Sequence, residues 1–493
     1  MFYIGFDVGS SSIKASLVNA KTGKAVSTVQ EPAQEMAIQS PRNHWAEQGA
    51  GLWWTHVCYA SKRLVTENTL NADAILGIGI AYQMHGLVLV DDKGEVIRDS
   101  IIWCDSRAVK LGDSAFQQLG ETACMEHLLN SPANFTASKL AWVKQNEPKN
   151  YEKVHKFMLP GDFIAFKFSN EYTTTISGLS EGILWDFKHS TPAKMVMDYY
   201  QIDNDLFPNI VETFGIQAKV STKGAKESGL LEGTPILYRA GDQPNNALSL
   251  NVFEPGEVAT TGGTSGVLYA VTESLKATEG IKLNNFAHVN HSKENPRIGK
   301  LLCINGAGIQ YRWLKDLLNP GANAYAQMNV LASEVPVGSN DLQIIPFGNG
   351  AERMFDNRTI GSHMCNLNFN QHSQGDILRA ALEGIAFAFV YGMEILKNDN
   401  TPIQVIRAGN DNLFQSKIFS ETIATLIDQE IEIYNTTGAI GAARAAGAVD
   451  DAFDISTVAS QNDYLETFEP LSKKENYQEA FLRWQNALNT IIQ

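Results

Sequence analysis

The sequence is poor in cysteine. Its 493 residues contain five cysteines, and no two of them form a CxxC pair or a metal-binding spacing. This absence argues against a disulfide framework, a zinc module and a thioredoxin-like redox centre. We expect idle or buried thiols in a reducing cytoplasm. The five are Cys58, Cys104, Cys124, Cys303 and Cys365.

Basic charge is also scarce. The 39 Lys and Arg residues are outnumbered by 54 Asp and Glu residues, which leaves a net charge of −15. No cluster of Lys and Arg occurs, and binding to nucleic acid requires a basic face. We therefore expect no nucleic-acid partner. A small anionic ligand held by backbone N–H groups remains compatible with this composition.

A long uninterrupted apolar run is missing as well. The most apolar segment, 377–396, carries Arg379, Glu383 and Glu394. These charges predict a buried helix rather than a membrane span. The N-terminus, MFYIGFDVGSSS, has neither a basic region nor a cleavable apolar stretch. We expect a cytoplasmic protein without a signal peptide or membrane association.

Two common nucleotide-binding motifs are lacking. Neither Gly-Lys pair, at 23–24 and 299–300, is followed by Ser or Thr, so there is no Walker A motif. The glycine pairs at 306–308 and 348–350 have no strand–turn–helix context and no third glycine. A dinucleotide-dependent dehydrogenase is therefore poorly supported.

What is present is the composition of an ordinary globular protein, with 44% apolar and 19% charged residues. The length suggests about two to four domains. Strand and helix patterns alternate along the chain, which favours α/β layers. Strands are predicted at 2–8, 13–19, 74–91 (two strands around a loop), 95–103, 405–409 and 430–435, and helices at 46–66, 107–120, 136–147, 306–318, 374–397, 412–427 and 470–493.

One hairpin pattern occurs twice. IGFDVGSSSIKASLV near the N-terminus and VATTGGTSGVLYAVT at 258–272 both run from an apolar strand through a turn of small residues into another apolar strand. Such a repeat suggests two domains of the same fold. We place them at 1–240 and 241–493, with the join inside 232–256. The last helix could pack back on the first domain.

Both hairpin turns suit phosphate. Small residues leave backbone N–H groups unobstructed, and a concave cluster of such groups binds phosphate oxygens. In the first turn, Asp7 would repel bare phosphate, so its carboxylate makes sense beside Mg²⁺ or the waters of that ion. A plain hairpin with a turn-stabilising Asp is the alternative. The second turn, Gly262–Gly266, offers the same chemistry.

Four further segments could carry chemistry. Asp242 follows the strand-like ILYRAG and could accept a proton, or simply cap a helix. Residues 83–86 lie between two apolar strands, where a pocket or a structural histidine would fit. Residues 103–107 pair Asp with Arg, which suits a ligand or a local ion pair. Residues 408–412 could approach a ribose, or form a helix cap.

These features in this order resemble the FGGY family of carbohydrate kinases, which have the actin- and Hsp70-like ATPase fold. One family signature resembles 136–146, although its leading position is occupied here by Asn134. The other resembles 362–383, with Asn366 at a usual glycine. Gln83-Met84-His85-Gly86 resembles the sugar motif of the xylulokinase branch, where glycerol kinases have Arg-Glu in place of Met84-His85.

The resemblance implies an α/β fold of two RNase H-like domains with ATP and Mg²⁺ in the cleft between them. The implied reaction is transfer of phosphate from ATP to D-xylulose at its 5-hydroxyl. Ribulose, gluconate, erythritol or fuculose remain alternative acceptors, and a non-catalytic sugar sensor remains a further alternative. A homodimer is also implied.

The resemblance further assigns roles to individual residues. Asp242 would be the catalytic base, and Asp7 would be the metal-side carboxylate, holding Mg²⁺ through water. The sugar would be bound by Gln83, Met84, His85, Asp105 and Gln243. ATP would be bound by Gly9, Ser10, Ser11, Ser12, Gly263, Thr264, Gly308, Gly409, Asn410 and Asn412.

Overall fold

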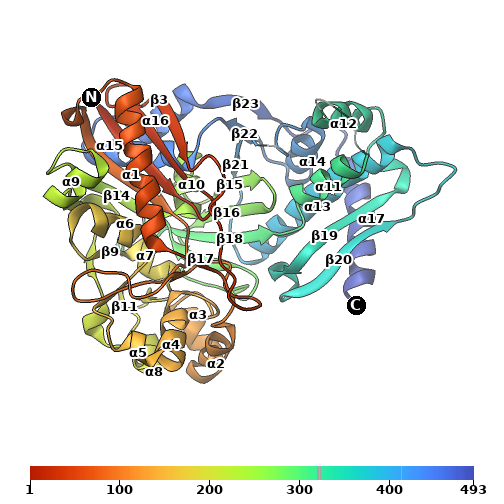
Figure 1. Ribbon diagram of the computed structural model, residues 1–493. Helices are drawn as coiled ribbons and strands as arrows, with labels where there is room; N and C mark the ends of the chain where they lie inside the picture. Colours follow the sequence, from red (N-terminus) through yellow and green to blue (C-terminus); the bar gives the residue numbers. More distant parts are fainter. Residues whose placement is uncertain (319–320, 322–323, 412) are drawn as a thin grey trace.

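The computed structural model describes residues 1–318, 321, 324–411 and 413–493 (Figure 1). Asn412, predicted at the ATP site, therefore lies outside the described residues. The structure is a mixed α/β fold built on two large sheets, as the sequence predicted. The first sheet has the order β13-β14-β5-β1-β2-β3. Its strands are β1 (Phe2–Val8), β2 (Ile13–Asn19), β3 (Ala25–Glu31), β5 (Ile75–Tyr82), β13 (Phe214–Lys219) and β14 (Pro235–Gly241).

The second sheet has the order β17-β18-β16-β15-β21-β22-β23. Its strands all come from the second half of the chain. They are β15 (Glu257–Gly262), β16 (Gly266–Thr272), β17 (Asn284–Ala287), β18 (Ile298–Ile304), β21 (Val405–Gly409), β22 (Ile431–Tyr434) and β23 (Tyr464–Phe468).

The two sheets share one topology. In the first, β1, β2 and β3 form an antiparallel meander, and β5 and β14 follow in parallel with β1. In the second, β15, β16 and β18 form the meander, and β21 and β22 follow in parallel with β15. The repeated hairpin in the sequence thus opens both sheets. The first sheet ends at Gly241 and the second begins at Glu257, so the predicted interval 232–256 spans β14 and the connection between the two sheets; the domain boundary itself stays a prediction.

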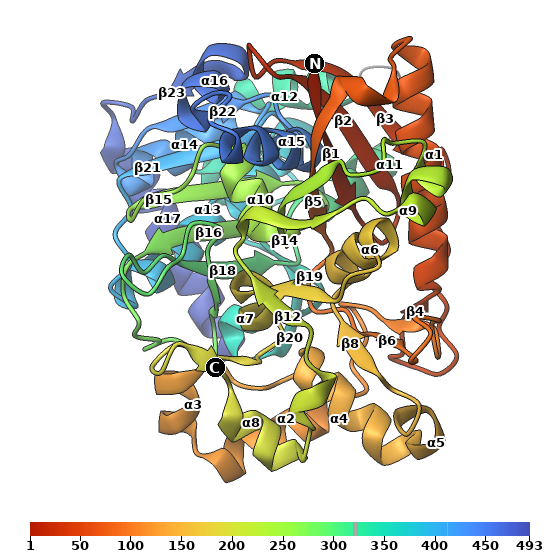
Figure 2. The same cartoon turned by 90° about the vertical axis from the view of Figure 1, so that its left-hand side faces the viewer.

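Helices cover the sheets and build two outer lobes (Figures 1 and 2). The helices are α1 (Ala50–Glu67), α2 (Val109–Leu119), α3 (Glu121–His127), α4 (Thr136–Asn146), α5 (Pro148–Tyr151), α6 (Pro160–Ser169), α7 (Ile176–Glu181), α8 (Lys194–Tyr200), α9 (Thr222–Ser228), α10 (Asp242–Ser249), α11 (Gly308–Leu318), α12 (Ala324–Ser333), α13 (Gln374–Asn398), α14 (Lys417–Ile427), α15 (Gly438–Val449), α16 (Ile455–Asn462) and α17 (Lys474–Ile492). Short strands are β4 (Glu47–Gln48), β6 (Val88–Val90), β7 (Ser100–Ile101), β8 (Lys156–Met158), β9 (Thr173–Thr175), β10 (Trp185–Asp186), β11 (Thr191–Pro192), β12 (Asn209–Val211), β19 (Gln343–Glu352) and β20 (Arg358–Cys365).

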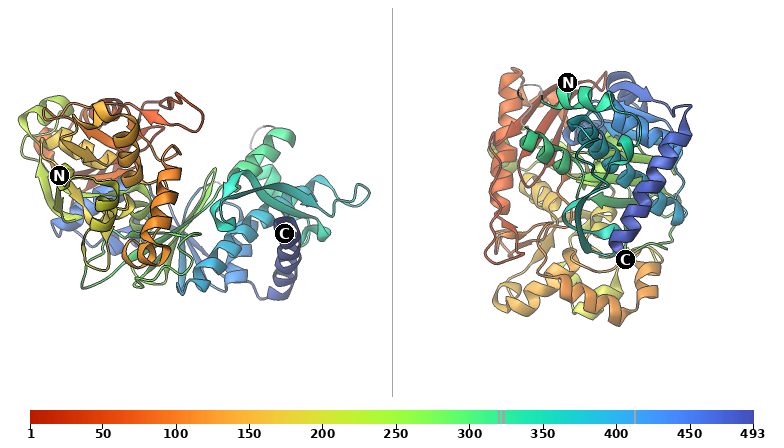
Figure 3. Two further views of the ribbon diagram at one scale, coloured as in Figure 1. Left: turned by 90° about the horizontal axis from the view of Figure 1, so that it is seen from below. Right: turned by 90° about the vertical axis from the view of Figure 1, so that its right-hand side faces the viewer.

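The helix that crosses between the halves is α15, not the last helix. Its small residues let its backbone contact the first sheet: a Cβ on Gly79 would lie 1.9 Å from the carbonyl oxygen of Ala442. The prediction that the last helix returns to the first domain is wrong. The C-terminal helix α17 packs in the second half (Figure 3). There Trp484 Nε1 donates to the Ile344 carbonyl at 2.9 Å. Its apolar face is taken up by β19 and α13–α14.

The most apolar segment forms α13, a buried helix, as predicted. Its N-terminus is closed by Ser373 and Asp376 in a capping box. Its buried charges are paired, since Arg379 Nε lies 2.8 Å from Glu383 Oε1. Among the helices that the structure describes, none is both long and apolar enough to cross a bilayer. The strand predicted at 95–103 shrinks to the two residues of β7, because only these pair with β4.

Candidate active site

Three neighbouring parallel strands end at the same edge of the first sheet. Tyr82, the last residue of β5, is in register with Val8 on one side and Gly241 on the other. The residues that follow these strands are therefore brought together, and this edge is where open α/β sheets bind ligands. Gln83 extends the pairing by donating its backbone N–H to the Val8 carbonyl at 2.9 Å. The geometry places Asp7, the 83–86 loop and Asp242 at one locus.

Asp242 is the first residue of α10 and is half-buried. Burial, and then the negative charge of Asp7, raise the pKa of its carboxyl to about 7, although hydrogen bonds from Gln243 oppose the rise. A general base works best when its pKa lies near the operating pH. Burial likewise raises the pKa of Asp7, against the opposing charge of Lys14. Asp242 thus has the proton affinity that a base at neutral pH needs.

His85 is held as a neutral hydrogen-bond acceptor. Its Nδ1 lies 3.0 Å from the backbone oxygen of Glu181, so Nδ1 carries the proton and Nε2 keeps a free lone pair. Burial, and then the charge of Lys139, lower the pKa of His85 to about 3. The ring contacts Phe135 and Phe286 with centroids 4.7 and 5.3 Å apart.

Two buried groups to which the sequence patterns assign no role support this loop. Lys139 is fully buried, and its Nζ donates to the carbonyls of His85 (2.8 Å) and Ile102 (3.0 Å). Burial lowers the pKa of Lys139 to about 7. Glu181 is also buried, and burial raises the pKa of its carboxyl well above the ordinary range. A Cβ on Gly241 would lie 2.8 Å from Glu181 Oε2, so this carboxyl lies against the backbone of the residue that precedes Asp242.

The other predicted sugar residues differ in their surroundings. Met84 is buried against Gly241. The buried side-chain amide of Gln83 has no hydrogen-bond partner among the described residues. Gln243 is half-buried beside Asp242. Asp105 is fully buried and used locally: its carboxylate accepts from Arg107 Nη2 at 2.7 Å and from the Ala46 N–H at 2.6 Å. A sugar contact by Asp105 stays a prediction.

The first hairpin turn is braced from outside its own strands. Gly9 N–H donates across the turn to the Ser12 carbonyl at 3.1 Å. Gln48 Nε2 donates to the Ser10 carbonyl at 2.7 Å, and the Ser11 carbonyl accepts from the Met36 N–H at 2.7 Å. These contacts fix the turn in front of Asp7 without covering all of its hydroxyls.

The second hairpin turn forms one unit with α11 and the loop after β21. The Asp411 carboxylate accepts from the Gly262 N–H at 3.0 Å, and Ile309 N–H donates to the Thr264 carbonyl at 3.0 Å. A Cβ on Gly308 would lie 2.1 Å from the Gly263 carbonyl oxygen, so only glycine fits there. A small cavity of about 50 Å³ is lined by Gly263, Thr264, Gly308, Tyr311, Arg312, Tyr325 and Leu413.

The remaining predicted nucleotide residues lie at the end of β21. Gly409 is its last residue, and Asn410 N–H donates to the Tyr434 carbonyl of β22 at 2.9 Å. Asp411, which the sequence placed in this segment without a role at the ATP site, links the loop to the second hairpin. The structure therefore brings Gly263, Thr264 and Gly308 together, with Gly409 and Asn410 on the adjoining loop. Direct contact of any of them with ATP stays a prediction.

Glu352 and Arg353 are further residues that the sequence reasoning missed. Glu352 is fully buried and accepts from the N–H groups of Asn305 (3.1 Å) and Gly306 (3.0 Å), which fixes the loop leading into α11. The positive charge of Arg353 contributes to the low pKa of His85.

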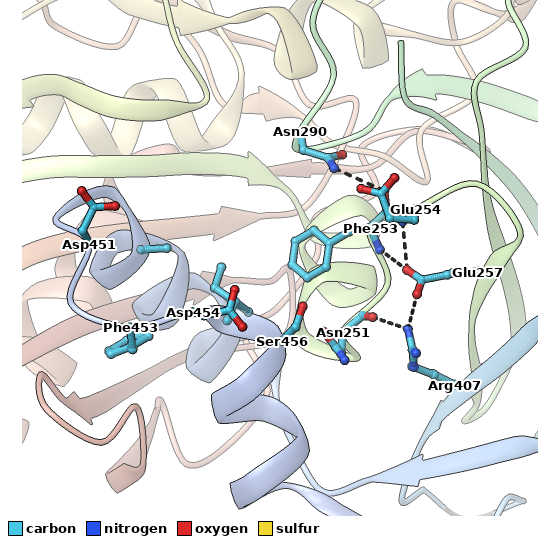
Figure 4. A pocket seen from close by; sticks show the side chains of 12 residues that line it. Asn251, Phe253, Glu254, Glu257, Asn290, Arg407, Asp451, Phe453, Asp454 and Ser456 are labelled. Atoms are coloured by element: carbon cyan, nitrogen blue, oxygen red, sulfur yellow. Dashed lines mark hydrogen bonds and ion pairs between the residues drawn. The ribbon is translucent and has the colours of Figure 1, made fainter. Parts of the chain in front are cut away.

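A much larger cavity lies elsewhere. It measures about 740 Å³ and lies where β15 and β21 begin, away from the ends that carry the glycine turns (Figure 4). Arg407 is one of the residues that line this cavity. Its Nη1 lies 2.7 Å from Glu257 Oε1 and its Nε lies 2.7 Å from Glu432 Oε2. None of the predicted site residues lines it, so size alone does not locate the site.

Two sheets of one topology, with Asp7 and Asp242 at one edge and turns of small residues in both hairpins, are the features of a two-domain phosphotransferase of the actin and Hsp70 type. The model of the FGGY family of carbohydrate kinases, N-terminal domain, matches residues 2–249. The chain belongs to the FGGY family of carbohydrate kinases. It is therefore an enzyme that transfers phosphate to an alcohol group, and the sugar kinases of this family use ATP, typically with a divalent metal.

Known relatives match over nearly the whole chain. Xylulose kinase of Haemophilus influenzae is 25% identical over 99% of this chain and 100% of its own length. Xylulose kinase of Staphylococcus xylosus is 25% identical over 88% of this chain and 89% of its own. The crystal structure of xylulose kinase from Rhodospirillum rubrum has a TM-score of 0.89 at 23% identity, covering 100% and 99% of the two chains. Gluconate kinase from Lactobacillus acidophilus has a TM-score of 0.86 at 21% identity, covering 100% and 98%.

Proposed function

We propose that this carbohydrate kinase phosphorylates D-xylulose at its 5-hydroxyl, using ATP and Mg²⁺, with Asp242 as the general base. The observation that carries the proposal is the convergence of Asp242 with the Met84-His85 loop at one sheet edge. The names of the relatives in Haemophilus and Staphylococcus support xylulose as the acceptor. The gluconate kinase neighbour has the same fold, so another sugar or polyol (ribulose, gluconate, erythritol or fuculose) is the alternative acceptor.

The sugar loop offers groups that match a polyhydroxy substrate. Neutral His85 can accept a hydrogen bond from a sugar hydroxyl at Nε2, because its Nδ1–H is committed to the Glu181 carbonyl. The Gln83 amide can both donate and accept. Met84 supplies an apolar floor beneath the base. In this proposal these three groups orient the ketose so that one terminal hydroxyl points at Asp242.

Asp242 then accepts the proton of that hydroxyl. The hydroxyl oxygen of the sugar forms a bond to the γ-phosphorus of ATP while the bond from that phosphorus to the leaving ADP oxygen breaks. The attacking and leaving oxygens lie roughly in line with the phosphorus. Little covalent work falls to the protein, so positioning and charge neutralisation dominate. The turns at 9–12 and 262–266 would hold the phosphates through their backbone N–H groups.

The residues around Asp7 suit a metal-bound phosphate. A Cβ on Gly438 would lie 2.7 Å from Asp7 Oδ2, so the glycine leaves the carboxylate uncovered at the N-terminus of α15. The negative charge of Asp7 raises the pKa of Asp242, and a cation beside these carboxylates would offset that repulsion. In this proposal Asp7 holds Mg²⁺ through water, and the ion would supply charge neutralisation to the phosphates.

The hinge between the halves would lie within 232–256, so closure would move α10 and Asp242 together. Closure would also exclude water from the γ-phosphate. The enzyme would act in the cytoplasm, and it would form a homodimer.

The test is ADP release by purified protein with ATP and Mg²⁺ against D-xylulose, D-ribulose, L-ribulose, erythritol, L-fuculose, gluconate, glycerol and no sugar. A strong preference for D-xylulose supports the proposal. A preference for another acceptor retains the kinase and refutes the assignment of the 83–86 loop. Tight ATP binding without turnover on any of them would favour a sugar sensor instead.

A further inference from the structure

A cluster of metal-ligating side chains lies outside the catalytic locus, in the outer helical lobe of the first half. His127 is the last residue of α3, Asp186 is the last residue of β10, and His189 stands in the turn between β10 and β11. One ligand atom from each residue lies within 4.8 Å of the others. The three residues come from two segments that are 59 positions apart in sequence.

The distances fit a shared ion. Asp186 Oδ2 lies 2.9 Å from Nδ1 of His127 and 2.9 Å from Nδ1 of His189. Two ligand atoms that are each about 2.0–2.1 Å from one ion are about 2.9 Å apart at a right angle and about 3.3 Å apart at a tetrahedral angle. A small movement of the two rings would thus place an ion where two Nδ1 protons now stand.

The central carboxylate is held rigidly. Its second oxygen, Asp186 Oδ1, accepts the backbone N–H groups of Lys188 (3.0 Å) and His189 (3.1 Å). A backbone bond from Phe187 N–H to the His127 carbonyl, 2.8 Å long, ties the turn to α3. Oδ2 is therefore oriented by the fold itself, so the adjustment to an ion falls to the two imidazole rings.

The outer histidine also leaves a route for entry. The side chain of His189 is 61% exposed, against 9% for Asp186. The neighbouring Lys188 forms an ion pair with Glu126, in which Nζ lies 2.8 Å from Oε2. An arriving ion would meet a carboxylate and two imidazoles without first displacing a lysine.

We propose that His127, Asp186 and His189 form a binding site for one divalent transition-metal ion of the zinc class. Two imidazoles and one carboxylate suit Zn²⁺, Co²⁺ or Ni²⁺, whereas Mg²⁺ and Ca²⁺ prefer oxygen ligands throughout. Three protein ligands leave a position for water. The ion would clamp the β10–β11 turn to α3, so it is a structural site, separate from the metal at Asp7.

The experiment uses tag-free full-length protein dialysed against EDTA and titrated with Co²⁺, whose visible absorption reports nitrogen and oxygen ligation. We expect one saturable equivalent, displaced by one equivalent of Zn²⁺, and a higher unfolding midpoint with Zn²⁺. The His127→Ala/His189→Ala variant should lose the band and the midpoint rise. Asp186→Asn should weaken binding while keeping the turn, because the amide oxygen still accepts both N–H groups.

The matched control is His44→Ala, which removes an exposed histidine outside the cluster. It should bind Co²⁺ as the wild type does. Sugar-kinase turnover and circular dichroism verify that each variant is folded. The proposal is overturned if the wild type shows no saturable band up to about 1 mM Co²⁺, the weak end of specific binding, or if the folded double variant keeps it.

Discussion

Replacement of Asp242 by Asn is the sharpest test of the catalytic assignment. The amide has nearly the shape of the carboxyl but cannot accept the proton of an attacking hydroxyl. Removing a general base lowers the rate by roughly 10²–10⁴-fold. We expect kcat to fall by that factor, with little change in the KM of ATP, measured by coupled ADP release at pH 8. Turnover within about threefold of wild type, far below that range, would refute the assignment.

The same variant should be more stable than the wild type at pH 8. The folded state raises the pKa of Asp242 from the ordinary 3.8 to about 7, so it keeps the proton where the unfolded chain has lost it. Wild-type stability contributed by this group is present below the unfolded pKa and is lost as pH rises through the folded one. One pKa unit corresponds to about 1.36 kcal/mol, so the cost at pH 8 is at most about 4 kcal/mol.

The pH dependence supplies an independent check. Wild-type kcat/KM should rise tenfold per pH unit below about 7 and level off above it, because the base must be unprotonated. Asp7→Asn removes the second contributor to the raised pKa of Asp242, so the acid limb of the residual activity should move to lower pH.

The stability prediction is checked by urea unfolding of the wild type and of Asp242→Asn at pH 5 and pH 8, which compares their free energies of unfolding. A stability difference that does not grow with pH would contradict the raised pKa.

Three other variants test the surroundings of the site. Lys139→Met removes the cation that ties two loop carbonyls together, and we expect the sugar KM to rise about tenfold, or 1.4 kcal/mol, with a smaller change in kcat. Glu181→Gln should leave both the rate and the acid limb of Asp242 unchanged, because burial already keeps this carboxyl neutral; a limb shifted to lower pH would mean that Glu181 is ionised. Asp411→Ala frees a buried N–H of the second hairpin turn, at a cost of about 1–3 kcal/mol, and should raise the KM of ATP while the sugar KM stays constant.

Local patterns predicted most of the elements and the duplication. The strands at 2–8 and 13–19 were found as predicted, because alternation and a turn of small residues are both local signals. The place of α15 could not be predicted in the same way. Its run GAIGAARAAGAV indicates close packing, but only the fold shows that the partner strand carries Gly79 some 360 positions earlier. The misplaced α17 has the same cause, since amphipathicity says that a helix packs but not where.

The residues of the candidate site also divide into those that the sequence could predict and those that it could not. Asp242 was predictable because a polar residue directly after a buried strand marks a sheet edge, and the hairpin turns were predictable from their composition. Lys139 and Glu352 were not, because their partners are backbone groups far away in sequence: the His85 carbonyl lies 54 positions from Lys139. A side chain that acts on a backbone atom leaves no residue-type pattern for sequence reasoning to find.

One physical cause, burial, sets the protonation states of the two main side chains in the proposed mechanism, Asp242 and His85. Removing water disfavours whichever form is charged, so the same burial raises the pKa of Asp242 to about 7 and lowers that of His85 to about 3. At neutral pH the carboxyl is divided between its two forms and the imidazole is uncharged. Proton uptake is thereby confined to Asp242, and His85 is left to accept hydrogen bonds. Two groups with ordinary pKa values of 3.8 and 6.5 have exchanged their order, and the roles of base and sugar ligand follow from that exchange.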